Sequence, residues 1–450
     1  MDDSYRIEKD TMGEVRVPST TLYGAQTARA IENFPISGRR FPRSFIRALG
    51  LIKGAAAKVN GSMGHLPVDR ATAIEAAAEQ VIEGRHDVEF AVDIFQTGSG
   101  TSTNMNANEV IGRLAGAHPN DAVNRGQSSN DVIPSAMHIA AAEAITMRLF
   151  PAMRRLQTSL ERKAEEFHEI IKIARTHLQD AAPMRMGQEF SGYARQVEAS
   201  HERIEVCLRG IYELALGGTA VGTGLNAPSG FAGATIEEIA RRTGLPFTEA
   251  PNHFEAQAGR EAMCFLSGGL RTYAVALTKI ANDIRWLGSG PRCGLGELRL
   301  PAVQPGSSIM PGKVNPVIAE SVLMVCAQVV GYDATITWCA AAGNFELNVM
   351  MPVLAYDLLD GIELLAAASR NFTEKLIDGL EADRERAEGY VEQSLAMATV
   401  LAPEIGYEKA AALVKEAYAT GRTVREIALE KSGIPQARLF ALLDPRSQVG

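Results

Sequence analysis

A short loop at residues 306–316 combines side chains that could bind and react with an anion. It reads Gly-Ser-Ser-Ile-Met-Pro-Gly-Lys-Val-Asn-Pro, and its polar side chains are those of Ser307, Ser308, Lys313 and Asn315. The cation and the amide are suited to hold a carboxylate, while backbone N–H groups near the serines can stabilise developing negative charge. The two glycines let the backbone bend close to a ligand. The same composition also suits a loop that caps a helix.

A phosphate-binding loop is the first alternative, because the string is close to the pattern G-x-x-x-x-G-K. The two glycines, Gly306 and Gly312, are one residue too far apart for that pattern. Val314 stands where a Ser or Thr would hold magnesium, and Pro311 removes a backbone N–H that would contact phosphate. The loop is therefore not predicted to bind a nucleotide.

Long helices are expected to position this loop and three other polar segments. The other segments are rich in Gly, Ser, Thr and Asn and cover residues 96–108, 118–131 and 217–226. Apolar residues at three- and four-residue spacing predict helix over almost all of 135–216, and over 255–287, 315–342 and 346–376. At about 1.5 Å per residue, such helices form a bundle roughly 40 Å long, with the polar loops on a rigid scaffold.

Part of this bundle is apolar on every side. Residues 322–327, Val-Leu-Met-Val-Cys-Ala, contain no polar side chain over more than a full turn. A helix that is apolar all round must be buried all round, and one chain supplies too few neighbours to cover several such helices. The pattern therefore predicts a homo-oligomer.

The length of 450 residues exceeds that of a single hydrophobic core, so we expect two or three structural units, and the patterns along the chain favour three. These are a mixed, mostly helical domain at 1–130, a central long-helix bundle at 131–382 and a small helical domain at 383–450.

Charge and composition exclude several classes of partner. A net charge of −8 and the lack of basic runs longer than a pair disfavour nucleic acid. No apolar run approaches the roughly 18 uninterrupted residues of a membrane span, and the acidic start is unlike a secretory signal, so we expect a cytoplasmic protein without a membrane partner. The five cysteines form no C-x-x-C pair and no His/Asp/Glu cluster has metal spacing, so no metal site is predicted.

Four ordered segments resemble the active-site motifs of the fumarase/aspartase superfamily. They are residues 96–109, 118–131, 175–180 and 306–316, and the resemblance extends from Tyr5 to the C-terminus. It implies a mainly α, three-domain fold whose central long-helix bundle assembles into a tetrameric 20-helix core. It also implies active sites shared between three subunits, a small dicarboxylate substrate and no cofactor.

The resemblance also implies roles for individual residues. Ser307 would be the base that removes a proton next to a carboxylate, giving an enolate-like intermediate, and His177 would pair with Glu320 near the reacting water. The predicted substrate-binding residues are Ser99, Thr101, Ser128, Ser129, Asn130, Thr176, Ser308, Lys313 and Asn315. A second anion site is implied at His118, Asn120 and Asp121, although the basic residue expected before His118 is replaced by Ala-Gly-Ala.

The motifs favour addition of water to fumarate, giving L-malate. Residues 127–131, Gln-Ser-Ser-Asn-Asp, and 343–349 resemble the fumarase versions, whereas aspartases tend to carry Thr at the position of Ser129. Residues 315–318 and 350–352 lean toward aspartase, so an aspartate ammonia-lyase is the alternative. A scaffold that has lost catalysis is disfavoured because Ser307, Lys313 and His177 are all retained.

Overall fold

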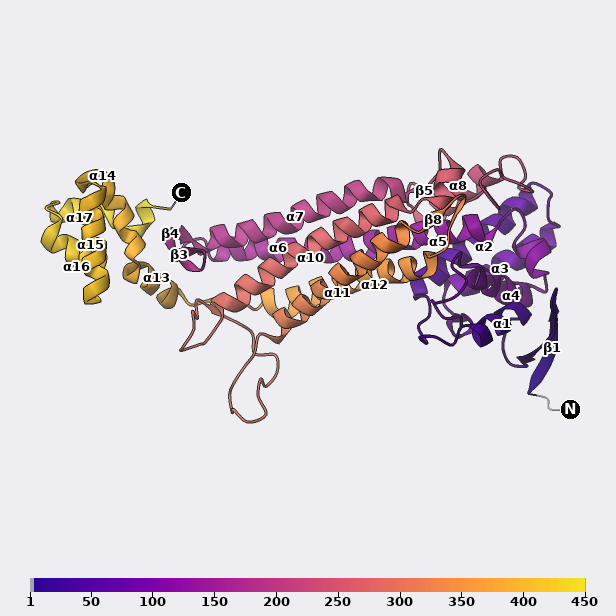
Figure 1. The fold of residues 1–450 in the computed structure, drawn as a ribbon, viewed down its shortest axis with the longest axis horizontal. Coiled ribbons are helices and arrows are strands. Elements are labelled where there is room, and N and C mark those ends of the chain that lie inside the picture. Colours follow the sequence, from indigo (N-terminus) through magenta and orange to yellow (C-terminus); the bar gives the residue numbers. More distant parts are fainter. Residues whose placement is uncertain (1–3, 450) are drawn as a thin grey trace. The chain divides into compact units, whose positions relative to one another are not determined.

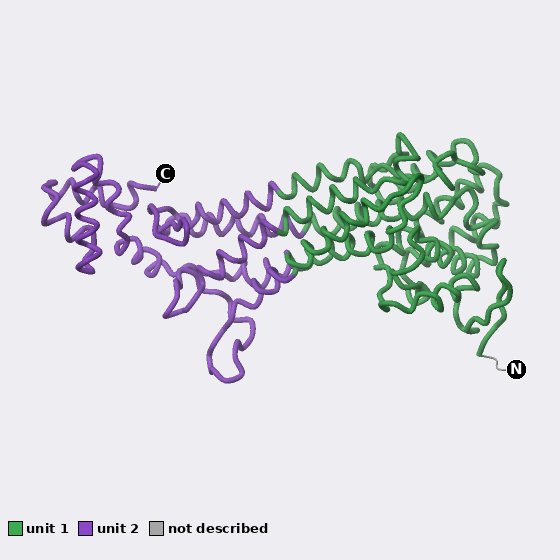
Figure 2. Tube along the Cα trace, in the orientation of Figure 1, with its two compact units in different colours: residues 1–151, 200–274, 325–367 green, residues 152–199, 275–324, 368–450 purple. Residues whose placement is uncertain are grey.

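The computed structural model describes residues 4–449, which form two compact units (Figures 1 and 2). Unit 1 contains the residues up to Pro151, Ser200–Ala274 and Val325–Ala367. Unit 2 contains Ala152–Ala199, Val275–Met324 and the residues from Ala368 on. Each of the long helices contributes residues to both units, because the boundary between the units falls within every one of them.

Unit 1 is built around one buried helix, α2. Its elements include the antiparallel hairpin β1 (Tyr5–Asp10) and β2 (Gly13–Pro18), and the helices α1 (Ala25–Asn33), α2 (Arg43–Ser62), α3 (Val68–Ile82), α4 (Thr101–Ala115), α5 (Ser129–Ala144), α8 (Phe231–Thr243) and α9 (His253–Ala258). Helix α2 contacts α3, α4, α5 and α8. Its run of Ala and Gly residues allows these close approaches, and Ala56 and Val59 pack against Phe231 of α8.

The predicted long helices are confirmed. They are α6 (Phe150–Glu166), α7 (Met186–Ile211), α10 (Glu261–Leu287), α11 (Val317–Ala340) and α12 (Met351–Phe372). In unit 1, Asp333 of α11 accepts hydrogen bonds from Ser267 and Arg271 of α10, both at 2.7 Å. In unit 2, Tyr193 of α7 donates to Asp283 of α10 at 3.0 Å. These buried polar contacts fix the register between helices that are otherwise mostly apolar.

The prediction of nearly continuous helix over 135–216 is wrong at one place. An antiparallel hairpin, β3 (Ile171–Thr176) and β4 (Gln179–Arg185), separates α6 from α7. Its first strand is rich in β-branched isoleucine, which favours an extended strand over a helix. The hairpin matters because its turn carries Thr176 and His177.

The C-terminal residues of unit 2 form short helices with a core of their own. They are α13 (Arg384–Gln393), α14 (Ala402–Ile405), α15 (Tyr407–Thr420), α16 (Val424–Lys431) and α17 (Gln436–Leu442). Leu413, Ile427 and Leu439 are buried together, and Ile171 and Ile173 of β3 join the same cluster. The division into three domains at 130 and 382 stays a prediction, because the two compact units cut the long helices at other points.

Helix α11 carries a large apolar surface. Among residues 4–449 it is the one helix long and apolar enough, by length and composition, to cross a membrane, yet Glu320, Gln328 and Asp333 interrupt it. Only 28% of its most apolar stretch is buried within the chain. Met324 is 68% exposed and Trp338 75% exposed. Such a surface needs a covering partner.

Ile427→Ala is expected to lower the free energy of unfolding of the C-terminal helices by about 2–5 kcal/mol, because it empties space in a packed core. The matched control is Leu429→Ala on the same helix, where the side chain is 43% exposed and the expected change is within about 0.5 kcal/mol. Urea denaturation followed by circular dichroism would measure both, and equal effects would contradict the assignment of this core.

Candidate active site

In unit 1 the first two predicted segments come together at the start of two helices. Ser99 and Thr101 stand at the N-terminus of α4, and their hydroxyl oxygens are 2.8 Å apart. Asn104, one turn further along α4, donates to the hydroxyl of Ser129 at 3.1 Å. Residues 96–108 and 118–131 therefore lie side by side in unit 1 and form one polar surface.

Gly98 brings a third segment to this surface. Its carbonyl accepts a hydrogen bond from Met351 N at 3.0 Å, which ties the first loop to the start of α12. A Cβ at position 98 would lie 1.7 Å from the carbonyl oxygen of Val349, so only glycine fits. The contact is therefore between two backbones.

The second segment ends in a fully capped helix. Ser128 is the N-cap of α5, and its hydroxyl accepts from Asn130 N at 3.2 Å while Asp131 accepts from Ser128 N at 2.8 Å. The dipole at a helix N-terminus favours an anion. Ser128, Ser129 and Asn130 therefore lie at this N-terminus, and their predicted role in binding a carboxylate stays a prediction.

Asp131 joins this helix end to the polar loop at 217–226. Its second carboxylate oxygen accepts from Gly217 N at 2.9 Å and Thr219 N at 3.0 Å, and Asn130 donates to Ala220 O at 2.8 Å. Burial raises the pKa of the Asp131 carboxyl, and the three backbone N–H bonds act in the opposite direction. The carboxyl group is therefore a structural acceptor at the base of the surface.

In unit 2 the turn of the β3–β4 hairpin presents Thr176 and His177 to solvent. His177 and Leu178 have φ values of 57° and 59°, which non-glycine residues adopt in two-residue hairpin turns at some cost. The strand leading to the turn is held by a buried ion-pair cluster, whose members are Lys172, Arg175, Glu189 and Glu297. Arg175 donates to Glu297 at 2.7 Å, so the turn is anchored to the chain segment that precedes residues 306–316.

The loop at 306–316 is closed by its own backbone. Gly306 N donates to Lys313 O at 2.7 Å, and the Asn315 side chain donates to Gly306 O at 2.7 Å. The hydroxyl oxygen of Ser307 accepts from Ile309 N at 3.2 Å and from Met310 N at 2.9 Å. The backbone N–H groups of Ile309 and Met310 therefore both donate to Ser307 Oγ, the atom that the motif predicts to be the base.

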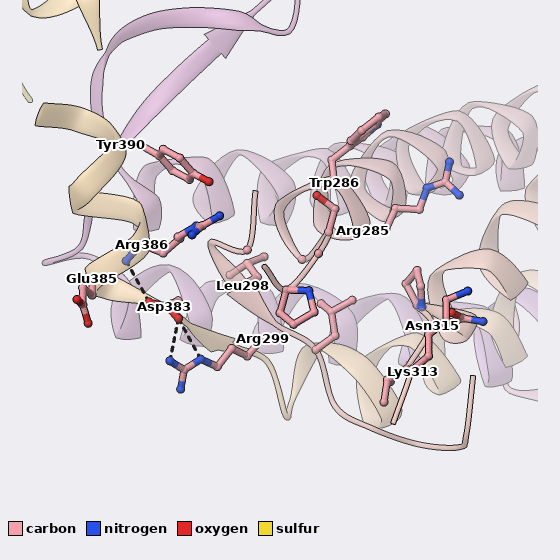
Figure 3. A pocket seen from close by; sticks show the side chains of 18 of the residues that line it. Arg285, Trp286, Leu298, Arg299, Lys313, Asn315, Asp383, Glu385, Arg386 and Tyr390 are labelled. Atoms are coloured by element: carbon pink, nitrogen blue, oxygen red, sulfur yellow. Dashed lines mark hydrogen bonds and ion pairs between the residues drawn. The ribbon is translucent and has the colours of Figure 1, made fainter. Parts of the chain in front are cut away.

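Lys313 and Asn315 line a cavity of about 1210 Å³ within unit 2 (Figure 3). Arg285, Arg299 and Arg386 also line it, and Arg299 is paired with Asp383 at 2.8 Å. Ser307 is not among the lining residues. The cavity presents several cations beside the loop, which suits an anionic ligand in a protein whose net charge is negative.

His177 and Glu320 are not hydrogen-bonded or ion-paired to each other within residues 4–449 of the chain. Both belong to unit 2, with His177 in the exposed turn and Glu320 in the first turn of α11. Their pairing stays a prediction.

The second anion site also stays a prediction. His118 accepts from Asp121 N at 3.1 Å, and both side chains are largely exposed. The nearest arginine on α4, Arg113, is paired with Glu8 at 3.0 Å. Across residues 4–449, no group of three or more His, Cys, Asp or Glu side chains is arranged to hold a metal ion.

Sequence reasoning missed the buried charges that support these surfaces, chiefly Lys53, Lys172 and Glu297. The available signal was a lone lysine inside an apolar run, as in Leu-Ile-Lys-Gly-Ala-Ala-Ala at 51–57. A charge in such a run is either exposed or paired in the interior, and periodicity alone does not distinguish the two.

A family model described as lyase matches residues 13–331, and one described as fumarase C C-terminus matches residues 397–449. The chain belongs to this lyase family, which confirms the resemblance found in the four motifs.

Individual relatives agree over nearly the whole length. The chain is 53% identical to a class II fumarate hydratase from Mycobacterium tuberculosis, covering 99% of this chain and 95% of the relative. It is 50% identical to one from Ralstonia nicotianae, covering 99% of each. The crystal structure of a class II fumarase from Schistosoma mansoni superimposes with a TM-score of 0.95 at 41% identity, covering 98% of each chain. The predicted mainly α fumarase/aspartase fold is therefore confirmed, whereas its three-domain division and its assembly into a tetrameric 20-helix core stay predictions.

Asp131→Asn is expected to reduce both stability and kcat/KM. The new amide nitrogen would face the Ser128 N–H in a buried place, and an unsatisfied buried donor costs about 1–3 kcal/mol. Thermal unfolding and steady-state kinetics would measure the two effects. The control is Asp69→Asn, an exposed carboxylate in the first turn of α3. Wild-type stability and kcat/KM in the Asp131 variant would contradict the role of the carboxylate as a structural hydrogen-bond acceptor.

Proposed function

We propose that the chain is a hydro-lyase that adds water reversibly across the double bond of fumarate to give L-malate. The observation that carries the proposal is identity of 50% or more over 99% of the chain to two class II fumarate hydratases. The substrate is then a small dicarboxylate, and the polar N-terminus of α5 and the cations near Lys313 are suited to its two carboxylates.

Ser307 is proposed as the base. In the malate-to-fumarate direction its Oγ takes a proton from C3, which leaves an enolate-like carboxylate. The C2–O bond then breaks, and the hydroxyl leaves as water with a proton donated by His177. A serine is a weak base unless its alkoxide is stabilised. The amide donors of Ile309 and Met310 support this role, because they would hold negative charge on Oγ.

The remaining predicted residues are proposed to hold the charge that builds up on the substrate. The residues proposed for this role are Ser99, Thr101, Ser128, Ser129, Asn130, Thr176, Ser308, Lys313 and Asn315. An intermediate with extra negative charge gains more from such donors than the substrate does. His118, Asn120 and Asp121 are retained as a proposed second anion site.

The active site is proposed to form in a homotetramer in which three subunits contribute. The apolar surface of α11, with Met324 and Trp338 exposed, supports burial against other copies. In such an assembly His177 of one copy would meet Glu320 of another, and the carboxylate would fix the ring tautomer that handles water. We place this assembly in the cytoplasm, without a metal or other cofactor.

Ser307→Ala is expected to lower kcat by about 100- to 10,000-fold, because it removes the proton acceptor. Size-exclusion chromatography with light scattering should show the same assembly as wild type. The comparison variant is Ser308→Ala, whose loss should raise KM more than it lowers kcat. A normal kcat in the Ser307 variant would exclude this base.

The identity of the product distinguishes a fumarate hydratase from an aspartate ammonia-lyase. Loss of fumarate absorbance should occur with EDTA present and without ammonium, and malate should accumulate. Loss that requires ammonium, with aspartate as the product, would instead identify an ammonia-lyase. No loss under either condition would point to an inactive scaffold or a different succinyl substrate.

A further inference from the structure

Lys53 is a lysine with no exposed surface, in the middle of helix α2. Burying an ammonium group is costly unless it is well hydrogen-bonded. Its Nζ donates to the side-chain oxygen of Asn124 at 3.0 Å and to that of Gln127 at 2.9 Å. Both acceptors lie in the segment that leads directly to Ser128, Ser129 and Asn130.

These acceptors in turn fix the backbone of the segment. The Asn124 oxygen also accepts from Asn104 at 3.3 Å and Asn108 at 3.2 Å, and the Asn124 amide donates to Gln127 O at 3.1 Å. Gln127 donates to Val123 O at 3.1 Å. One ammonium group thus stands at the centre of a network that joins α2, α4 and the loop before α5.

We propose that Lys53 is a positioning residue that holds residues 124–130 in the conformation that binds a substrate carboxylate. The proposal rests on the proposed function, since it takes Ser128, Ser129 and Asn130 as carboxylate-binding residues. Lys53 acts through Asn124 and Gln127 and does not touch the substrate.

Charge gives Lys53 a second effect on the same subsite. The Asp131 carboxylate is buried behind the loop, and Lys53 is the cation that attracts it. Without a charged Lys53, the Asp131 carboxylate would keep its three backbone N–H donors but lose its cation, and it would repel a dianion approaching the N-terminus of α5 more strongly. Positioning and charge compensation both favour substrate binding.

The other elements packed on α2 leave Asp131 as the main charged group facing Lys53. Helix α4 contributes the amides of Asn104 and Asn108. Helices α8 and α3 contribute Arg242 and Glu79, which are paired with each other beside Gly54. Burial lowers the pKa of Lys53 to about 7, and the attraction of Asp131 acts against this. The ammonium form, and the compensation it provides, is therefore present below about pH 7 and lost as the pH rises through that value.

The first test compares Lys53→Met with Lys58→Met in the full-length enzyme. Lys58 lies on the same helix with its side chain 45% exposed, paired with Glu238. The Lys53 variant should raise KM for fumarate at least tenfold with a smaller change in kcat, while circular dichroism and assembly stay as in wild type. The Lys58 variant should stay within twofold of wild type in both constants. A folded Lys53 variant with wild-type KM would overturn the proposal.

The second test does not depend on the folding of that variant. Gln127→Glu is nearly isosteric and puts a carboxylate against Nζ, which raises the pKa of Lys53. In wild type, KM for fumarate should rise through an inflection near pH 7, and Gln127→Glu should move that inflection up by at least one pH unit. An inflection at the same pH in both proteins would contradict the proposal. Failure of the proposed function is distinguishable, because wild type itself would then not turn over fumarate.

Discussion

The need to satisfy a buried carboxylate dominates the organisation of unit 1. Both oxygens of Asp131 accept backbone N–H groups, from Ser128 on one side and from Gly217 and Thr219 on the other. A buried acceptor left unpaired is more costly than a typical hydrogen bond is worth, so the two loops have little freedom to separate. The positions of Ser129 and Asn130 follow from this constraint, as does the place of Lys53 beneath them.

Unit 2 uses the same principle with different residues. Lys172, Arg175 and Glu297 are buried or nearly so, and they pair with one another under an exposed, conformationally demanding turn. In each unit the groups proposed to meet substrate are neutral or exposed, while the charges that fix them lie below the surface. Preorganised donors of this kind stabilise developing charge without having to move first.

Periodicity was enough to predict the long helices, because their apolar residues recur over many turns. It failed at the β3–β4 hairpin, where a short isoleucine-rich stretch is compatible with either helix or strand. The candidate site residues came from four motifs whose order matched a family, and spacing alone would have left Ser307 in a capping loop. Lys53 could not be recognised because burial depends on which helices pack against α2. The proposed pairing of His177 with Glu320 came only from the family motifs, because the two residues lie far apart in the sequence.

The backbone contact at Gly98 has a consequence for synthesis of the chain. The loop before α4 is completed only by Val349 and Met351, which lie far toward the other end of the sequence. During translation, α2, α4 and α5 therefore leave the ribosome long before Val349 and Met351, which contact Gly98, have been synthesised. A chain that stops short of α12 therefore lacks the backbone contact that completes this loop, and the loop can take its final form only after residues 349–351 have been synthesised.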